Sequence, residues 1–148
     1  AEGVHTNLDT SGNPFTDQEP WHSGWLELMK YTDLVMLDIK QIDEQEHIKL
    51  TGHSNKNILA MAQELSDMKK PVWIRHVLVP DGSDKDEYLH RLADFIHTLS
   101  NVERVEVLPY HTLGKFKWEN LGLSYPLEGV NPPTQERIDN ARKILGAI

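Results

Sequence analysis

The sequence contains no cysteine among its 148 residues. A disulfide framework, a zinc site built on thiolates and a cysteine nucleophile are therefore excluded for this chain. An iron–sulfur cluster held by cysteine is excluded on the same ground, because thiolates are the usual ligands of such clusters. This absence restricts the chemistry of the chain more than any other feature of its composition.

Basic residues and long apolar runs are also scarce. Lys and Arg number 15 against 23 Asp and Glu, which gives a formal net charge of -8. Nucleic-acid binding depends on Lys and Arg that neutralise phosphates, so we exclude nucleic acid as a partner. No segment approaches the roughly 18 apolar residues of a membrane span, and no signal segment opens the sequence. We therefore expect no membrane association and a cytoplasmic location.

The composition that remains is typical of a globular domain. Hydrophobic residues make up 39% and charged residues 26% of the chain. A chain of this length buries about 68–70% of its unfolded surface on folding, which is enough for a core. Since no linker or low-complexity tract interrupts it, we expect residues 1–148 to form one domain.

Four short apolar runs rich in β-branched residues recur along the chain. Their starts lie about 30 to 38 residues apart, the length of one strand–helix unit. They lack a clean polar/apolar alternation, which indicates strands of a parallel sheet covered on both faces. The four predicted strands are Val4–Leu8, Leu34–Ile39, Val72–Val79 and Val105–Leu108.

Helix signals fall between these runs. Ser83 followed by Asp86 is a variant of the capping box, and Ser54 and Thr134 are expected to begin two further helices. A first helix is predicted near Pro20. The residues expected to face the core are Trp25 and Leu28 in the first helix, Ile58, Met61, Leu65 and Met68 in the second, Leu89, Leu92, Ile96 and Leu99 in the third, and Ile138, Ala141 and Leu145 in the last.

Alternating strands and helices predict right-handed βαβ units in an α/β fold. Four units do not close a barrel, which has eight strands in its complete form. We therefore expect either a partial barrel or a sheet whose first edge is covered by another element. Residues 113–133 form a long loop, in which Phe116 and Trp118 either dock a polypeptide or anchor the loop to the sheet.

Every predicted strand delivers polar residues near its carboxyl end, where parallel α/β folds bind ligands. The first strand runs into Asp9-Thr10-Ser11-Gly12 and the second into Asp38 and Lys40. The third carries Arg75 and Val77, and the fourth runs into Tyr110-His111. Five histidines on predicted helices or loops are expected to be exposed and are given no role: His22, His47, His53, His90 and His97.

Two interpretations of the strand ends stay open. Asp38 can accept hydrogen bonds from a ligand ammonium, while Arg75 clamps its carboxylate and His111 contacts a ribose or purine edge. Alternatively, Asp38, Lys40 and Arg75 pair only with one another across neighbouring strands. Residues 9–12 are equally well explained as a turn in which Asp9 caps and Gly12 adopts a positive φ.

Six segments spread over nearly the whole chain form a recognisable series. They are Gly3-Val4-His5-Thr6-x-Leu8-Asp9-Thr10-x-Gly12, Thr32-Asp33-Leu34-Val35-Met36-Leu37-Asp38-Ile39-Lys40, Val72-Trp73-Ile74-Arg75-x-Val77, Leu108-Pro109-Tyr110-His111, Gly114-Lys115-x-Lys117-Trp118 and Gly129-Val130-x-Pro132-Pro133. Taken in order, these segments resemble the pyruvate formate-lyase activating enzymes, a radical S-adenosylmethionine family.

The resemblance implies a partial (β/α)6 TIM-like barrel, of which these strands are the last four. It implies reductive cleavage of S-adenosylmethionine by a [4Fe-4S] cluster, a glycyl radical formed on pyruvate formate-lyase, and flavodoxin or ferredoxin as electron donor. The implied S-adenosylmethionine residues are Asp38, Lys40, Arg75, Val77 and His111. The implied monovalent-cation site comprises Asp9, Thr10, the backbone of Met36, and Asp38.

The chain departs from the family pattern at several points. The CxxxCxxC loop and the Gly-Gly-Glu stretch are absent, and Asp81 stands where relatives usually have glycine. We therefore expect the chain alone to be inactive and its open strand edge to favour self-association. Two alternatives remain: a non-catalytic half-barrel that binds a protein partner, and a metal-dependent hydrolase that uses Asp9, Asp38 and His111.

Overall fold

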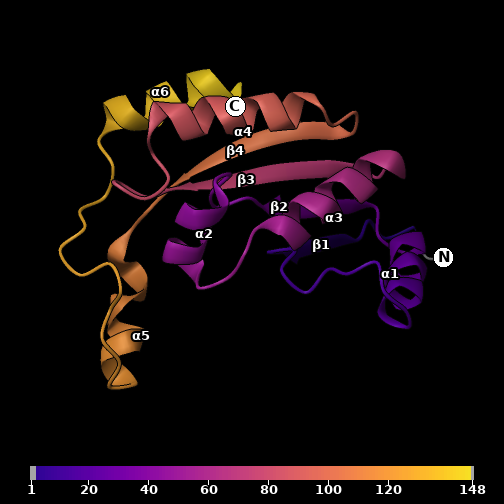
Figure 1. Ribbon diagram of the computed structural model, residues 1–148, viewed down its shortest axis with the longest axis horizontal. Helices are drawn as coiled ribbons and strands as arrows, with labels where there is room; N and C mark the ends of the chain where they lie inside the picture. Colours follow the sequence, from indigo (N-terminus) through magenta and orange to yellow (C-terminus); the bar gives the residue numbers. More distant parts are fainter. Residues whose placement is uncertain (1–2, 148) are drawn as a thin grey trace.

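The computed structural model describes residues 3–147, in which strands and helices alternate along most of the chain (Figure 1). The strands are β1 (Asn7–Thr10), β2 (Leu34–Asp38), β3 (Val72–Leu78) and β4 (Val102–Pro109). The helices are α1 (Trp21–Lys30), α2 (Glu44–Thr51), α3 (Lys56–Asp67), α4 (Asp86–His97), the 3-10 turn η1 (Thr112–Gly114), α5 (Lys115–Asn120) and α6 (Gln135–Leu145).

The four strands form one parallel sheet in the order β1-β2-β3-β4. Each strand therefore pairs with the strand that follows it in sequence, as successive right-handed βαβ units require. The predicted α/β class with parallel strands is confirmed. In the part of the chain that the structure describes, β1 and β4 are the two edges of the sheet.

The core lies on one face of this sheet. Residues at alternate positions of the strands, such as Val35, Leu37, Val72 and Ile74, are fully buried against the helices. The helices contribute Trp25 and Met29 from α1, Ile58, Met61, Ala62 and Leu65 from α3, Leu89, Leu92, Ala93 and Ile96 from α4, and Ile138, Ala141 and Leu145 from α6. In Figure 1, α4 and α6 lie side by side beside β4.

The opposite face of the sheet carries partly exposed side chains. Met36 and Asp38 of β2 lie on it, as do Trp73 and Arg75 of β3. The prediction that both faces of the strands are covered is therefore wrong for the described residues. The burial of β3 alternates strictly, because only one of its two faces meets helices.

The first predicted strand is displaced. The structure begins β1 at Asn7 rather than Val4, and Val4 is 75% exposed. Pairing with β2 sets this boundary, since Asn7 aligns with Leu34 and Thr10 with Leu37. At the other edge, β4 starts three residues earlier than the predicted run, because Val102 pairs with Val72.

The structure confirms one of the predicted helix caps and contradicts another. Thr134 caps α6 as predicted, accepting a hydrogen bond from the Arg137 amide at 3.3 Å. Ser83 does not cap α4; it is fully buried, donates to the Val77 carbonyl at 2.6 Å and accepts from the Val79 amide at 2.9 Å. Ser83 therefore fixes the turn after β3 instead of beginning a helix.

Other helical details also differ from the predictions. Helix α3 begins after Asn55 rather than at Ser54, and Leu28 and Met68 are exposed instead of facing the core. Helices α2 and α5 were not predicted. Helix α2 is short and mostly polar, so its apolar periodicity is weak, but Asp43 caps it by accepting from the Gln45 and Glu46 amides.

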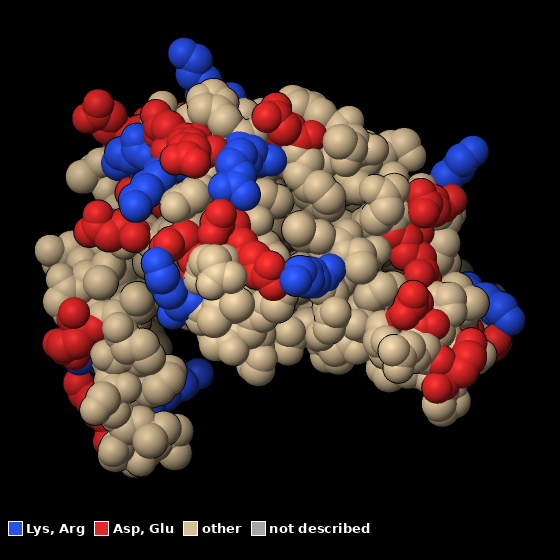
Figure 2. Space-filling model, in the orientation of Figure 1, with Lys and Arg blue, Asp and Glu red and all other residues tan. Residues whose placement is uncertain are grey.

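The segment 112–133, here called the arm, contains η1 and α5 and projects away from the sheet (Figure 1). In the space-filling view its tip stands apart from the body of the molecule (Figure 2). Among residues 3–147, no helix is long and apolar enough to cross a membrane.

Candidate functional site

Polar side chains converge where β1, β2 and β3 approach their carboxyl ends. Asp38 and Arg75 are register partners, and Arg75 Nε donates to Asp38 Oδ1 at 2.8 Å. The same guanidinium donates through Nη1 to Asp9 Oδ2 at 3.0 Å and through Nη2 to Asp9 Oδ1. Three neighbouring strands are thus joined by one arginine fork, which suits paired carboxylate oxygens geometrically.

Lys40 completes this group of charges. Its Nζ donates to Asp38 Oδ2 at 3.0 Å, so Asp38 uses both carboxylate oxygens within the protein. Burial lowers the pKa of Arg75, but the hydrogen bond to Asp9 and the charges of Asp38 and Asp9 outweigh it and raise the pKa above its ordinary value. We call Asp9, Asp38, Lys40 and Arg75 the charged cluster.

The charged cluster bears on both interpretations of the sequence. Its members pair with one another across strands, as the ion-pair alternative requires. They also lie on the sheet face that the core helices leave uncovered, so they remain within reach of a ligand. The side chains of Arg75 and Asp38 are each 17% exposed.

An apolar hollow of about 380 Å³ adjoins the cluster at Lys40. Val77 lines it from the end of β3, which places this predicted residue beside the cluster. His111 is exposed and is not among the residues that line this hollow. The lining residues are Lys40, Leu50, Thr51, Val77, Val79, Tyr110 and Leu127.

The arm supplies one wall of this apolar hollow. Tyr125 of the arm shares a 2.7 Å hydrogen bond between hydroxyls with Tyr110, which is buried. Burial, together with the hydrogen bond and charge of Tyr125, raises the pKa of Tyr110 to about 12. Sequence reasoning treated the arm as a loop and did not identify Leu127 as a wall residue or Tyr125 as the partner of Tyr110, since neither belongs to a recognisable pattern.

A second hollow of about 140 Å³ shares Lys40 and Thr51 with the apolar one, and we call it the polar hollow because most of the residues that line it are polar. It brings His47 of α2 next to Asp38 and Lys40. His47 is only 2% exposed, so the expectation that it is an exposed histidine without a role is wrong as regards its burial. The lining residues are Ser11, Asn13, Asp38, Lys40, His47, Thr51, His53 and Ile58.

The residues of the expected cation site are placed near one another by the β1–β2 ladder. Asp9 pairs in register with Met36, and Thr10 Oγ1 accepts a hydrogen bond from the Gly12 amide at 3.0 Å. Arg75 occupies the position between the Asp9 and Asp38 carboxylates. Within residues 3–147 no group of three or more His, Cys, Asp or Glu side chains is arranged to hold a metal ion.

The turn after β1 adopts the expected glycine conformation. Gly12 has φ +70°, and a Cβ at this position would lie 3.0 Å from Leu37 Cδ1 and 3.3 Å from the Ile58 Cα. Asp81, at a position where the family resemblance predicts glycine, also adopts a positive φ of 62°. The backbone of that turn therefore takes the left-handed conformation with a non-glycine residue in place.

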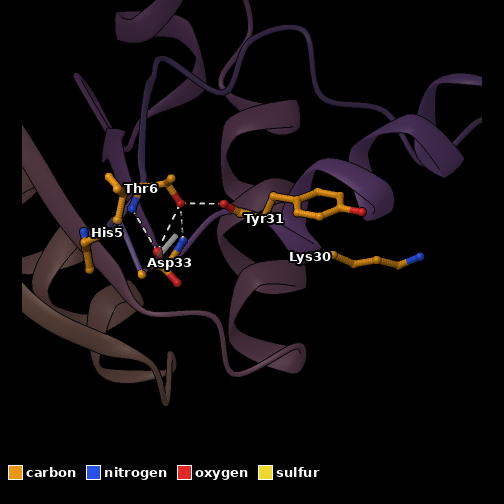
Figure 3. Close-up of a pocket in the computed structure, with 7 residues that line it drawn as sticks. His5, Thr6, Lys30, Tyr31 and Asp33 are labelled. Atoms are coloured by element: carbon orange, nitrogen blue, oxygen red, sulfur yellow. Dashed lines mark hydrogen bonds between the residues drawn. The ribbon is translucent and has the colours of Figure 1, made fainter. Parts of the chain in front are cut away.

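A hollow of about 500 Å³ lies at the opposite, amino-terminal end of the sheet (Figure 3). Asp33 accepts there from the Thr6 amide at 2.8 Å and the Thr6 hydroxyl at 3.1 Å. These bonds tie the start of β1 to the start of β2. Since ligands of parallel α/β folds bind at the carboxyl ends, we assign this hollow a structural role.

The arm exposes several large apolar side chains. Phe116 is 55% exposed, whereas Trp118 packs edge-on against Tyr125 with ring centroids 6.0 Å apart. Trp118 thus anchors the arm to itself, and Phe116 is free for an external contact. Other exposed apolar residues of the arm are Leu113, Leu121 and Leu123.

No protein-family model matches the chain. Individual proteins do match it closely. It is 54% identical over 144 residues to a pyruvate formate-lyase-activating enzyme of Streptococcus mutans, a match that covers 97% of this chain and 55% of that protein. It is 55% identical over 145 residues to the enzyme of the same name from Staphylococcus epidermidis, covering 98% of this chain and 58% of that protein.

Solved structures agree on the fold. A domain of a pyruvate-formate lyase-activating enzyme from Bacteroides vulgatus superposes with TM-score 0.75 at 21% identity, covering 97% of this chain and 76% of that one. A radical SAM methyltransferase from Sphaerobacter thermophilus superposes with TM-score 0.64 at 17% identity, covering 95% and 37%. The four-stranded α/β sheet therefore matches part of a radical SAM TIM-like barrel.

The curated relatives are longer than this chain, which spans little more than half of their length. The matched part nevertheless includes almost every residue of the chain, from the β1 turn to the last helix. Sequence identity above one half over such a length requires common descent. The chain is therefore a partial homologue of the pyruvate formate-lyase-activating enzymes.

Proposed function

We propose that this chain forms the part of a glycyl-radical activating enzyme that binds the methionine and adenosyl groups of S-adenosylmethionine. The complete enzyme would cleave S-adenosylmethionine reductively and generate a glycyl radical on pyruvate formate-lyase. The observation that carries the proposal is the charged cluster beside an apolar hollow at the carboxyl end of the sheet.

The order of charges in the cluster matches a zwitterionic amino acid. Asp38 would accept hydrogen bonds from the ligand ammonium, taking over the place that Lys40 and Arg75 fill in the free chain. Arg75 would clamp the ligand carboxylate in place of the Asp9 carboxylate. Three ion pairs of the free chain would thus be exchanged for two with the ligand. Asp38 and Arg75, the most buried members, each keep an opposite charge as partner, and the charges released are those of the more exposed Lys40 and Asp9.

The hollow supplies the complementary apolar part of the site. Val77 and Tyr110 line it, and it adjoins Lys40, so a flat heterocycle in the hollow would lie directly beside the charged cluster. Pockets of this kind combine apolar walls with a few well-placed polar groups that fix orientation. His111 lies next in sequence to Tyr110, and we propose that it contacts the ligand from the rim.

The [4Fe-4S] cluster of the family does not fit the residues of this chain. Its usual ligands are cysteine thiolates, and the chain has no cysteine. We therefore assign no reaction step to this chain alone. Its own residues bind and orient the ligand, and the cluster that supplies the electron would be held by other residues.

We also propose a monovalent-cation site at Asp9, Thr10, Met36 and Asp38. Asp9 becomes available to a cation when a ligand carboxylate replaces it at Arg75. The proposal predicts that S-adenosylmethionine binds the chain more tightly in potassium chloride than in tetramethylammonium chloride of equal ionic strength. Equal affinity in the two salts would contradict it.

A chimera tests the main proposal. The segment of the Streptococcus mutans relative that precedes the matched region would be fused to this chain, and glycyl-radical formation on pyruvate formate-lyase would be followed by electron paramagnetic resonance with reduced flavodoxin as donor. We expect the chimera to form the radical and the Arg75→Ala variant to lose this activity. The Arg91→Ala variant should retain it, because Arg91 pairs with Asp43 and is not part of the charged cluster. A chimera that carries its [4Fe-4S] cluster but forms no glycyl radical would refute the proposal.

Polypeptide docking is a second candidate function, favoured by the exposed apolar side chains of the arm. It would make the chain a half-barrel that binds a protein without radical chemistry. Tight binding of pyruvate formate-lyase to the chain alone, abolished by Phe116→Ser, would support it. Binding that requires the fused amino-terminal segment would favour the activating enzyme instead.

A further inference from the structure

His47 has a buried ring nitrogen without a hydrogen-bond partner. The residue is 2% exposed and lines the polar hollow, yet its Nε2 contacts no donor among the described residues. Buried polar atoms in folded proteins are nearly always paired, and an unpaired one costs free energy. An occupant of the hollow that donates a hydrogen bond would remove this cost.

The other ring nitrogen determines what Nε2 can do. His47 Nδ1 lies 2.7 Å from the His53 carbonyl oxygen, which only accepts hydrogen bonds. Thr51 Oγ1 also lies 3.1 Å from Nδ1, but it donates its proton to the His47 carbonyl at 2.8 Å. In the neutral ring the proton is therefore on Nδ1, which leaves a lone pair on Nε2. The missing partner must be a donor.

Helix α2 holds this ring in place. Asp43 caps the helix at its start, and Gly52 ends it with φ 80°, so the helix is fixed at both ends. Two contacts on Nδ1 fix the rotation of the imidazole. An acceptor held rigidly before its ligand arrives loses little conformational entropy on binding.

The surroundings indicate the class of the donor. The polar hollow measures about 140 Å³ and also presents the charges of Asp38 and Lys40. It shares Lys40 and Thr51 with the apolar hollow, so the two hollows adjoin at these residues. A nucleoside has this arrangement, because its flat base would fill the larger hollow and its compact sugar would bring hydroxyl donors into the smaller one.

We propose that His47 binds the ribose diol of the adenosyl ligand, with a ribose hydroxyl donating to Nε2. Lys40 lies at the junction of the two hollows and donates to the oxygen of the same diol. This inference rests on the proposed function, since it names a further contact of the same ligand. His47 would then favour a ligand that carries ribose over one that carries deoxyribose.

The test compares adenosine with 2′,3′-dideoxyadenosine on the whole 148-residue chain by calorimetry. His47→Asn is the informative variant, because the asparagine amide nitrogen can still donate to the His53 carbonyl while no acceptor remains at the position of Nε2. We expect the wild type to bind adenosine more tightly than the dideoxynucleoside. In His47→Asn the ratio of the two affinities should fall by about 3- to 10-fold, the effect of one neutral hydrogen bond. Binding of the dideoxynucleoside should not change.

His76→Asn is the matched control. His76 is also a buried histidine, but its ring nitrogens face the carbonyl oxygens of Ile39 and Ser83, to one of which the neutral ring donates, and it lines neither hollow. Its variant should keep the preference for adenosine. If His47→Asn keeps the full preference as well, the role of His47 is refuted.

A spectroscopic measurement covers the case in which His47→Asn does not fold. In the wild-type chain, the ¹⁵N resonance of His47 Nε2 should shift on addition of adenosine and not on addition of the dideoxynucleoside. A shift with both ligands, or with neither, would overturn the inference. The proposed function is tested separately. Weaker S-adenosylmethionine binding in Arg75→Lys would support the proposed function whatever the result for His47. If the wild type binds neither S-adenosylmethionine nor adenosine, both the proposed function and the role of His47 are overturned.

Discussion

Asp38 and Arg75 face each other across the β2–β3 ladder and are joined by a 2.8 Å hydrogen bond from Nε to Oδ1. Both side chains are largely buried, and removal of Asp38 leaves Arg75 with the more exposed Asp9 alone, while removal of Arg75 leaves Asp38 with Lys40 alone. We expect Asp38→Ala and Arg75→Ala each to lower the free energy of unfolding by about 1–3 kcal/mol.

A double-mutant cycle in urea measures how strongly this pair is coupled. The double variant should lose clearly less stability than the sum of the two single variants, because each single variant already breaks the interaction. Additive losses would show that the two charges act independently. The exposed pair of Lys30 and Glu27 on α1 is the control, and its coupling should be small.

Gly12→Ala should destabilise the chain by about 1–3 kcal/mol. The positive φ disfavours any residue with a Cβ, and the added methyl would meet Leu37 and the Ile58 backbone. Gly24→Ala is the matched control, since Gly24 lies within α1 with no atom within 4 Å of the added Cβ. Gly24→Ala should raise the free energy of unfolding by roughly 0.5–1 kcal/mol, because alanine has a higher helix propensity than glycine. Equal effects of the two changes in thermal unfolding would contradict this explanation.

His76 makes the chain sensitive to acid. Burial lowers its pKa below the ordinary value of 6.5, although the carbonyls of Ile39 and Ser83 partly offset this. A lowered pKa means that the unfolded chain takes up the proton first, so the stability contributed by neutral His76 is complete above pH 6.5 and is lost as the pH falls below it. Urea unfolding of His76→Gln should show a weaker pH dependence between pH 7 and 5 than the wild type. Parallel profiles would exclude His76 as the source.

Tyr110 makes the corresponding contribution at alkaline pH. Its pKa rises from 10.0 to about 12, so its stabilising effect is complete below pH 10 and is lost as the pH rises through 12. Ultraviolet titration of phenolate should show one tyrosine fewer ionising near pH 10 in the wild type than in the urea-unfolded chain. Tyr125→Phe removes the 2.7 Å hydrogen bond and should lower the pKa of Tyr110. An unchanged titration in this variant would contradict the assigned partner.

Local sequence patterns predicted the order of elements well. Leu89, Leu92, Ile96 and Leu99 repeat at helical spacing and are all buried, and each apolar run lies in or next to a strand. These features depend on neighbours in sequence, which a pattern records directly. The position of β1 was missed because its boundary depends on pairing with Leu34–Leu37, a contact between distant residues.

Only part of the arrangement of the candidate site could be predicted from the sequence. The strand-end rule located Asp38, Lys40 and Arg75 at one end of the sheet, because parallel strands bring their carboxyl ends together. It did not find His47, since burial of a histidine on a polar helix depends on how α2 packs against the sheet. It also did not find Tyr125 and Leu127, because the direction of the arm is not encoded in a periodic pattern.

The buried Ser83 has a consequence for ligand recognition. Its hydroxyl joins the Val77 carbonyl to the Val79 amide, and Gln41 holds the same turn through a 2.8 Å hydrogen bond to the Gly82 carbonyl. These bonds form when the chain folds, and none of them uses a group that the proposed ligand would contact. The wall made by Val77 and Val79 is therefore preorganised, and closing it around a heterocycle requires no further loss of backbone entropy.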